Sequence, residues 1–599
     1  MRRGVAVAVA VGSLLVAASV YVPFWYQADH LWWSIHHDRN AHYVTALQLA
    51  TSLRQFNLFL FVKHLVALTV WPPGGYLLPA LVLTAAGYDI RWAVLPNALS
   101  WAASAWLAFA IAKRCLPSGG SIAGVIAALL VLASPIHRGF AVDLMLESTG
   151  VFLTLLCLHA YLIAVQTDTT RSWAWLGASL TALLITKYNY WLMVLLALGG
   201  TEAVRRANDY ALWALSQVRF SFHSRDFLSP WNLSLLLFAL AVAVVALLQP
   251  PPVWGVRLSP PTNAFWLLYV LFLVRLAKIY WGTLGQLDPR AAALVYWHVV
   301  PAALFMALPR HITTFLWYVS PWNGPHSDRT MFDGIEFYSR ALLAEYHPTA
   351  MLAWIALAGF LLGLIFASGL RPGSAAVFTL ALLGAFLVCK HPNQQERFAC
   401  TWVPVAWIGS ALGMMGLASV VASRWRQVAL IPCLFASAAV ITLLIPHVVD
   451  GRRSRLAGPR VEVVSQAELA RVLVKEAQSE KRVMILASTP VRFLAEWAFL
   501  QAEGSTQRLE GRWFGFRSAG RDNVEGFRQW LEKPTCERIL TVEVPGETTD
   551  PEVEMLVAPH RELLPVLRSS SAFQLRRLQL VAGFRVGVYE RFSGLQVAR

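Results

Sequence analysis

The sequence predicts an α-helical polytopic membrane protein, with about thirteen transmembrane helices followed by a soluble C-terminal α/β or α+β domain. Hydrophobic residues make up 57% of the 599 residues, charged residues only 14%, and there are 25 tryptophans. Such a composition is typical of a chain that meets lipid. Apolar runs of about 20 residues, enough to cross a hydrocarbon layer of roughly 30 Å, recur up to Val449 and then stop. We therefore expect a transmembrane domain at residues 1–449 and a soluble domain at residues 450–599.

Basic residues predict the orientation of the spans. Arg2 and Arg3 precede the first apolar run, so this run starts in the cytoplasm and leaves the membrane near Pro23. Alternating spans then place later basic residues inside: Lys113, Arg114, Arg205, Arg206, Lys278, Arg371, Arg424 and Arg426. Much of the net charge of +16 lies in short loops and in the tail after Gly451. Membrane topology and contact with anionic lipid explain it, so no nucleic-acid partner is expected. An odd number of spans predicts a multi-pass plasma (inner) membrane protein whose C-terminal domain is periplasmic or extracellular.

The first outer loop, residues 25–75, is too polar to be a span. It concentrates acidic, basic and aromatic side chains, among them Asp38 and His42. From Tyr43 to Leu68 the apolar residues keep a helical period, which predicts interfacial helices along the membrane plane. Two prolines, Pro72 and Pro73, end this pattern, because proline cannot continue a helix.

Later outer segments carry further charged residues. Asp143 and Glu147 follow Ser134-Pro135, and because they are four residues apart we expect them on one face of a helix. Lys187 lies at the end of the next outward span, and Lys390 and Arg397 flank a polar loop before a late span. Cations at span ends are placed where a lipid phosphate would lie, although each can also be a snorkelling anchor.

The C-terminal segment has the pattern of a small mixed domain. Ser465 to Gln478 predicts a helix that begins with a capping box, and residues 482–487 and 538–544 predict strands. Residues 573–591 predict a strand pair that turns at Ala582-Gly583. The segment has no glycine-rich phosphate loop and no nucleophile elbow, so we expect it to support or shape the substrate site.

The order of these elements resembles that of GT-C-type membrane glycosyltransferases, in particular the bacterial branch of protein mannosyltransferase-like and aminoarabinose transferase-like enzymes. The resemblance covers residues 1–450. The resemblance rests on the order of six elements along the chain. They are Asp38 followed further on by the aromatic Tyr43, Pro72-Pro73-x-x-Tyr76, Asp143 after Ser134-Pro135, Thr186-Lys187, Lys390-His391-Pro392 and Glu396-Arg397-Phe398.

The resemblance implies a GT-C-like bundle and an inverting glycosyltransferase. Such an enzyme moves a sugar from a polyprenyl-phosphate donor to a lipid, glycan or protein acceptor on the outer face of the membrane. Asp38 matches the family's general base, and Asp143 matches its second acid, which orients the acceptor or a cationic group. The residues assigned to substrate binding are Asp29, His42, Tyr43, Glu147, Lys187, Lys390 and Arg397.

Several alternatives stay open. The family often has a second acid directly after the first, where this chain has Arg39, so Asp29 is an alternative base. Asp38 itself is equally suited to be a solvated loop acid or a helix N-cap. The three histidines at positions 36, 37 and 42 raise the question of a metal site; the resemblance requires no cofactor, leaves a divalent cation open and assigns no metal ligand.

Two other functions are compatible with a polytopic chain: a lipid or sugar transporter or flippase, and a noncatalytic partner with a GT-C fold. Transporters usually carry charges or broken helices at mid-membrane in related halves of the chain. This sequence has no such internal repeat, and its candidate acids lie in outer loops, which favours an enzyme.

Overall fold

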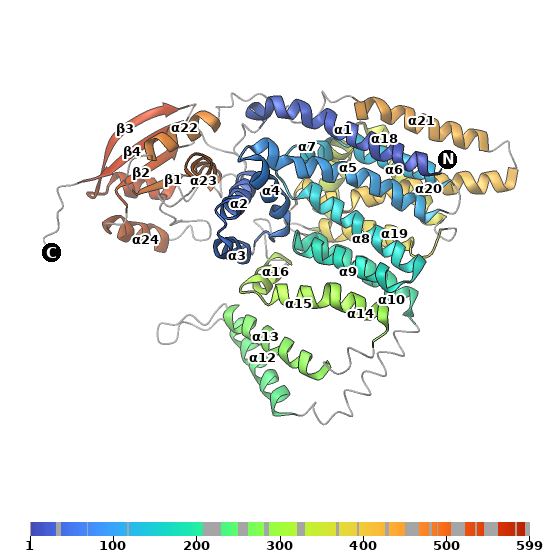
Figure 1. Cartoon of the computed structure of the whole chain (residues 1–599), viewed down its shortest axis with the longest axis horizontal. Coiled ribbons are helices and arrows are strands. Elements are labelled where there is room, and N and C mark those ends of the chain that lie inside the picture. Colours follow the sequence, from blue (N-terminus) through green and yellow to red (C-terminus); the bar gives the residue numbers. More distant parts are fainter. Residues whose placement is uncertain are drawn as a thin grey trace.

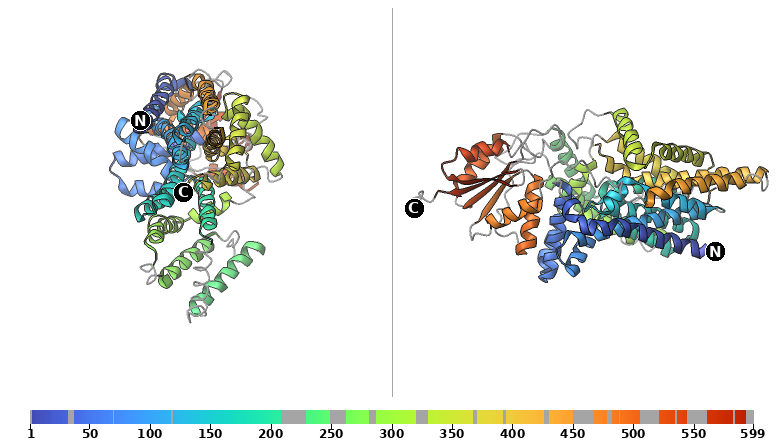
Figure 2. Two further views of the ribbon diagram at one scale, coloured as in Figure 1. Left: turned by 90° about the vertical axis from the view of Figure 1, so that its right-hand side faces the viewer. Right: turned by 90° about the horizontal axis from the view of Figure 1, so that it is seen from above.

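The computed structural model describes residues 2–31, 37–68, 70–116, 119–207, 229–248, 262–280, 287–319, 330–366, 370–391, 394–425, 430–449, 466–477, 482–487, 489–504, 521–533, 536–543, 561–581 and 584–592. The helices up to residue 449 form an elongated bundle (Figure 1). A four-stranded sheet with its own helices lies at one end of this bundle, as the views in Figure 2 also show.

The N-terminal helices form one side of the bundle. The long helix α1 (Arg2–Leu31) packs against α5 (Ile90–Cys115). Three shorter helices lie between the bundle and the sheet (Figure 1): α2 (His37–Arg54), α3 (Leu58–Ala67) and α4 (Gly74–Ala86). Asp38 lies in the first turn of α2, where a carboxylate stabilises the positive end of the helix dipole. Two helices therefore fill the stretch in which the sequence predicts interfacial helices.

The centre of the bundle contains α6 (Gly120–Ala133), α7 (Pro135–Ala141), α8 (Glu147–Thr167), α9 (Thr170–Leu184) and α10 (Tyr188–Arg205). Helices α6 and α7 meet at an angle of 67° at Ser134, because Pro135 starts a new helix at its first position. A capping box between Thr169 and Ser172 starts α9 directly after α8 ends.

One pair of helices lies at the edge of the molecule. Helix α12 (Pro230–Leu248) packs against α13 (Thr262–Tyr280), away from the central helices (Figure 1). The segment that joins this pair to the bundle consists of α14 (Pro289–Leu294), the π-helical turn η2 (Val295–Val299), α15 (Val300–Met306) and α16 (His311–Val319). Of these, α14 and η2 pack against α9.

The last helices of the bundle cross closely. They are α17 (Met331–Ala341), the π-helical turn η3 (Leu342–Tyr346), α18 (Ala350–Ile365), α19 (Ala375–Lys390), the 3₁₀ turn η5 (Glu396–Thr401), α20 (Val403–Trp425) and α21 (Leu430–Val449). Helices α18 and α20 touch backbone to backbone, since a Cβ added at Gly413 would lie 1.9 Å from the carbonyl oxygen of Gly359. Small residues four apart allow such an approach, and Gly363 and Gly409 complete the pattern on the two helices.

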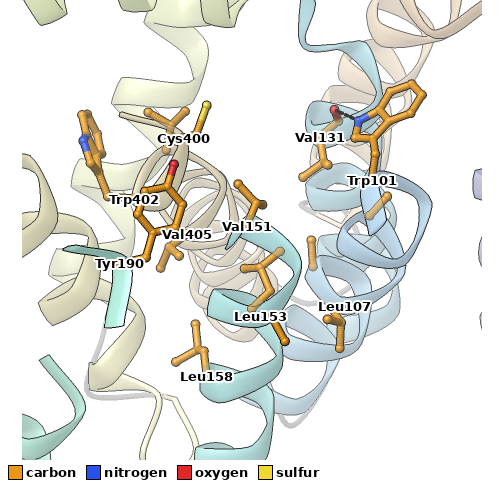
Figure 3. Packing of buried hydrophobic residues seen from close by; sticks show 14 of the residues in the cluster. Trp101, Leu107, Val131, Val151, Leu153, Leu158, Tyr190, Cys400, Trp402 and Val405 are labelled. Carbon is orange, nitrogen blue, oxygen red and sulfur yellow. Dashed lines mark hydrogen bonds between the residues drawn. The ribbon is translucent and has the colours of Figure 1, made fainter. Parts of the chain in front are cut away.

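A single large apolar cluster joins the helices of the bundle. Figure 3 shows part of it, where side chains of α5, α6, α8, α10, η5 and α20 meet. The indole N–H of Trp101 donates to the carbonyl of Val131 at 3.2 Å, so the buried polar atom of this large side chain is satisfied.

The sheet has the strand order β1-β2-β4-β3, with β1 (Val483–Ala487), β2 (Arg538–Glu543), β3 (Phe573–Val581) and β4 (Phe584–Arg591). Strands β1 and β2 are parallel and the other neighbours antiparallel. Successive residues point to opposite faces, so Leu540 packs with α22 (Gln466–Ala477) and α23 (Thr489–Glu503), whereas Ile539 packs with α24 (Arg521–Glu532). The four predicted strands are confirmed, and α22 lies within the helix predicted from Ser465 to Gln478. Ser465, Gln478 and the predicted turn at Ala582-Gly583 lie outside the described residues.

Membrane spans are recognisable by length and apolar composition. Within the described ranges, three helices meet both criteria over Gly4–Tyr26, Ile90–Cys115 and Glu147–Thr167, and two bent helix pairs raise the number to five. Several shorter apolar helices accompany them. The count of about thirteen spans and the domain boundary at residue 450 stay predictions.

The expected shared helical face of Asp143 and Glu147 is wrong. Helix α8 begins at Glu147, and Asp143 lies in the connection that follows α7. The side-chain amide of Asn97 donates to the carbonyls of Asp143 at 2.5 Å and Met145 at 2.8 Å. These bonds hold the connection in a non-helical form, because they use carbonyl oxygens that a helix would pair internally.

Candidate functional site

Most of the charged residues chosen from the sequence meet around one cavity. The cavity has a volume of about 260 Å³ and lies where α2, α8, α10, α19 and η5 come together. Its polar and charged walls are formed by Asp38, His42, Glu147, Lys187, Asn189, His391 and Arg397. Aromatic and aliphatic side chains form the rest: Val70, Trp71, Pro72, Leu146, Tyr188, Leu192, Met193, Leu387, Val388 and Phe398.

The carboxylate of Asp38 is bonded to the guanidinium of Arg397. Arg397 Nη1 donates to Asp38 Oδ2 at 2.5 Å, and the side chains are only 12% (Asp38) and 22% (Arg397) exposed. The two residues are 359 positions apart in the chain. A candidate base and a candidate phosphate-binding cation are therefore in direct contact on the cavity wall.

A second carboxylate links the two cations. Glu147 accepts a hydrogen bond from Lys187 Nζ at 2.6 Å, and Arg397 Nε lies 3.9 Å from the same oxygen. The Glu147 side chain is 2% exposed, so these cations supply the partners that a buried carboxylate needs. Asp38, Arg397, Glu147 and Lys187 thus alternate in sign along one wall.

Three tyrosine hydroxyls hold the backbone of the turn that carries Arg397. Tyr338 donates to the carbonyl of Gln395 at 3.1 Å, Tyr346 to that of Glu396 at 2.6 Å, and Tyr190 to that of Arg397 at 3.3 Å. All three tyrosines are buried. Their hydroxyls satisfy the carbonyls of a short 3₁₀ turn that has few bonds of its own.

His42 lies one helical turn after Asp38 and faces the same cavity. Its Nδ1 is hydrogen-bonded to the hydroxyl of Tyr76 at 2.9 Å, and its ring meets that of Trp71 edge-on at 5.0 Å. Burial lowers the pKa of His42 to about 4, although Asp38 and Glu147 act in the opposite direction. His42 is therefore neutral at pH 7 and acts as a hydrogen-bonding group.

Asp143 is bound to Arg39 rather than exposed to the cavity. Arg39 Nε and Nη2 each donate to one carboxylate oxygen of Asp143, both at 2.6 Å. This bidentate pair ties the first turn of α2 to the connection before α8. Arg39, the residue at which the sequence departs from the family pattern, thus holds the helix that carries Asp38.

Comparisons with known proteins place this geometry in a known fold. Residues 70–248 match the profile of the family described as dolichyl-phosphate-mannose-protein mannosyltransferase. The structure of ArnT from Cupriavidus metallidurans bound to undecaprenyl phosphate is similar, with a TM-score of 0.50, 12% identity, and coverage of 98% of this chain and 99% of that one. The archaeal oligosaccharyltransferase AglB from Archaeoglobus fulgidus, in complex with an inhibitory peptide and a dolichol-phosphate, gives a TM-score of 0.51, 13% identity, and coverage of 98% and 74%.

The chain therefore has a GT-C-type fold. A search of curated protein sequences finds no match. The GT-C fold and the apolar helices make it a membrane protein.

Two of the residues predicted from sequence, Tyr43 and Lys390, do not line this cavity. Tyr43 points away from the cavity, and its hydroxyl donates to the carbonyl of Tyr88 at 2.7 Å. Lys390 is exposed at the end of α19 and is not one of the residues that line the cavity. The side chain of Asp29 is outside the described residues.

Tyr43 instead connects α2 to the C-terminal segment. The ring of Trp497 on α23 lies 5.7 Å from that of Tyr43, and the side-chain amide of Gln501 donates to the Tyr43 hydroxyl and to the Tyr88 carbonyl, both at 2.6 Å. Phe493, Trp497 and Leu500 pack into the apolar cluster of the GT-C bundle, whereas Val491 and Phe499 on the same helix pack beneath the sheet. Helix α23 therefore belongs to both apolar clusters.

The question of a metal site depends on how His, Cys, Asp and Glu side chains group together. Among the described residues, no group of three or more lies close enough to hold an ion. His36 and the side chain of His37, which the sequence raised as candidates, lie outside the described residues. His42 uses Nδ1 for Tyr76.

Sequence reasoning missed the tyrosines that hold Arg397 and the partner of Arg39. Tyr190 follows Thr186-Lys187 closely in the sequence, and Tyr338 lies in a stretch that holds other aromatic residues. Their contacts join segments at least fifty positions apart, so no local pattern in a single sequence carries the signal.

Proposed function

We propose that this chain is an inverting glycosyltransferase that moves a sugar from a polyprenyl-phosphate donor to an acceptor on the outer face of the membrane. The acceptor is a lipid, a glycan or a protein. One observation carries the proposal: the carboxylate of Asp38 and the guanidinium of Arg397 line the same cavity of a GT-C fold, 2.5 Å apart. Glycosyl transfer from a lipid phosphate needs a base for the acceptor and a cation for the leaving phosphate, within one sugar's reach.

The donor phosphate is assigned to Arg397 and Lys187. Both cations face the cavity, and Glu147 between them holds them together when no phosphate is bound. The similar ArnT and AglB structures hold undecaprenyl phosphate and dolichol-phosphate, which supports a lipid phosphate as the ligand. Lys390, proposed from the sequence for the same task, is the less suitable cation because its side chain is exposed outside the cavity lining.

The general base is assigned to Asp38. Donor phosphate competes with Asp38 for Arg397, and when the phosphate takes the guanidinium, Asp38 Oδ2 becomes available to an acceptor hydroxyl. The hydroxyl oxygen then attacks the anomeric carbon and its proton passes to Asp38. The bond from that carbon to the phosphate oxygen breaks, and polyprenyl phosphate leaves. A single displacement of this kind inverts the configuration.

Asp143 is assigned an orienting role through Arg39. The bidentate pair fixes the first turn of α2, so that Asp38 and His42 face the cavity from the same side of the helix. This is the family's second acid acting on a cationic group, and Asp143 does not contact the reacting atoms.

The outer face is assigned from the ends of the helices. Helices α8 and α10 start at the cavity, with Glu147 and Tyr188, and end beside Asp168 and Arg205 at the other end of the bundle. Basic residues gather at that far end: Lys113, Arg114, Arg205, Arg206 and Arg371. Because basic residues mark the cytoplasmic side, the cavity belongs outside, together with a periplasmic or extracellular segment 450–599.

Transfer of radiolabel from a panel of polyprenyl-phosphate sugars to membrane acceptors tests the proposal. Wild-type protein and Glu396→Gln, which changes an exposed acid beside Arg397, should transfer, whereas Asp38→Asn should not. No transfer by the wild type from any donor, together with movement of a lipid-linked sugar across vesicles, would support a transporter instead. Equal transfer by Asp38→Asn would move the base to Asp29.

A further inference from the structure

Tyr190 is buried beside the cavity and does not line it. It lies in the first turn of α10, its side chain is 0% exposed, and its neighbours Asn189 and Leu192 face the cavity where Tyr190 does not. Tyr190 therefore contacts no ligand in the cavity, and its effect on a ligand passes through other residues.

One contact of Tyr190 is with Lys187. The ammonium group of Lys187 lies 4.4 Å from the centroid of the Tyr190 ring, over its face. A cation in this position is attracted by the electron-rich face of the ring. The ring and the Glu147 carboxylate together hold the ammonium group, since Lys187 Nζ also donates to Glu147 at 2.6 Å.

Tyr190 also contacts the turn that carries Arg397. The Tyr190 hydroxyl donates to the backbone carbonyl of Arg397 at 3.3 Å. One side chain thus touches both candidate phosphate cations, Lys187 through the ring face and Arg397 through the hydroxyl. Lys187 is the N-cap residue of α10 and Arg397 belongs to η5, so the two cations are more than two hundred positions apart in the chain.

A glycine on α8 makes room for this ring. A Cβ added at Gly150 would lie 2.7 Å from Cε2 of Tyr190, closer than real Cβ contacts allow. Gly150 follows Glu147 by three residues, so the two lie on one face of α8. The same face of α8 therefore provides the carboxylate for Lys187 and the space for the tyrosine beneath it.

We propose that Tyr190 is a positioning residue that fixes the separation of Lys187 and Arg397, and thereby the affinity of the site for a lipid-linked phosphate. The inference rests on the proposed function, because it assigns a phosphate to these cations. It predicts two separable contributions: the hydroxyl acts on Arg397 and the ring acts on Lys187.

Two substitutions separate these contributions in the full-length protein. Tyr190→Phe removes only the hydroxyl, and we expect about a three- to tenfold weaker binding of a sugar-free short-chain polyprenyl phosphate. Tyr190→Leu also removes the ring, and we expect a further loss of about threefold from the cation–ring contact. The matched control is Tyr269→Phe on α13. It deletes a hydroxyl that donates to the carbonyl of Ala303 on α15 at 3.4 Å, and Tyr269 does not line the cavity.

The same two substitutions, made in a protein that also carries Lys187→Met, distinguish a positioning role from a purely structural one. The quantity compared is the difference in phosphate affinity between Tyr190→Leu and Tyr190→Phe. Without the ammonium group, Tyr190→Leu and Tyr190→Phe should bind the phosphate equally, because the ring has lost its cation. An unchanged gap between them, or binding of Tyr190→Phe equal to that of the wild type, would overturn the inference while leaving the proposed function intact. A wild-type protein that binds no polyprenyl phosphate would overturn both. Tyr190→Phe decides the question even where Tyr190→Leu fails to fold.

Discussion

Replacing Asp38 with asparagine should have opposite effects on binding and on transfer. In the wild type, a donor phosphate must displace the Asp38 carboxylate from Arg397 before it can use this guanidinium fully. Asparagine keeps the size and one oxygen of the side chain but removes the charge. We therefore expect polyprenyl phosphate to bind more tightly to Asp38→Asn, and sugar transfer to be lost.

The size of the gain follows from the geometry of the pair. A hydrogen bond between charged groups contributes about 1.5 to 3 kcal/mol net. The lower end applies here, since the Arg397 side chain is 22% exposed and water reaches it in either state. A difference of about 1.4 kcal/mol is a factor of ten, so the dissociation constant should fall about tenfold. Loss of the base should lower the transfer rate by about 10² to 10⁴.

The assay compares titration of a sugar-free, short-chain polyprenyl phosphate with radiolabel transfer for the same preparations. Glu396→Gln removes one negative charge next to Arg397 without touching the ion pair, and it should leave both quantities near wild type. Binding of Asp38→Asn that is equal to or weaker than wild type would refute the competition for Arg397. Tighter binding with retained transfer would show that Asp38 restrains the cation but is not the base.

Three further predictions concern the framework around the site. Asp143→Asn should cost about 3 kcal/mol of unfolding free energy, because it leaves Arg39 buried without its carboxylate. Unfolding in mixed SDS micelles measures this loss of free energy. The double variant Arg39→Met with Asp143→Leu should recover part of it, whereas losses of the two single variants that simply add would contradict the pairing. The pKa of His42 is about 4 in the folded protein and about 6.5 in the unfolded chain. Between these pH values the unfolded chain binds more protons, so the free energy of unfolding should fall as the pH drops from 6.5 to 4. His42→Gln should flatten this decline in a thermal melt measured across that pH range. Gly413→Ala should destabilise the bundle by about 1 to 3 kcal/mol, since its Cβ would meet a carbonyl oxygen of α18. Gly526→Ala on α24 meets nothing within 4 Å, and the better helix propensity of alanine should raise stability by up to about 1 kcal/mol in the same micelle assay.

Local patterns in the sequence predicted the parts of the fold that depend on local physics. The strands at residues 483–487 and 538–543 follow from short apolar runs bounded by polar residues, and the helical period from Tyr43 to Leu68 corresponds to α2 and α3.

The sequence could not predict which charges pair. Asp38 pairs with Arg397, which is 359 positions away in the chain, and Asp143 pairs with Arg39, which is 104 positions away. A spacing of four residues predicted a shared face for Asp143 and Glu147, but Asn97 from another helix holds the backbone between them open. Tertiary hydrogen bonds of this kind override local periodicity, and a single sequence contains no record of them.

Because α23 packs against both the helical bundle and the sheet, it limits which segments of this protein can be exchanged with those of a relative. Trp497 and Gln501 are fitted to Tyr43, on the helix that carries Asp38, while other side chains of α23 are fitted to the sheet. A chimera cut at residue 450, with its C-terminal segment taken from a relative, would bring a foreign surface against α2. Exchange between relatives would therefore need to move α2 and α23 together, and substitutions on these two helices would be inherited as matched sets.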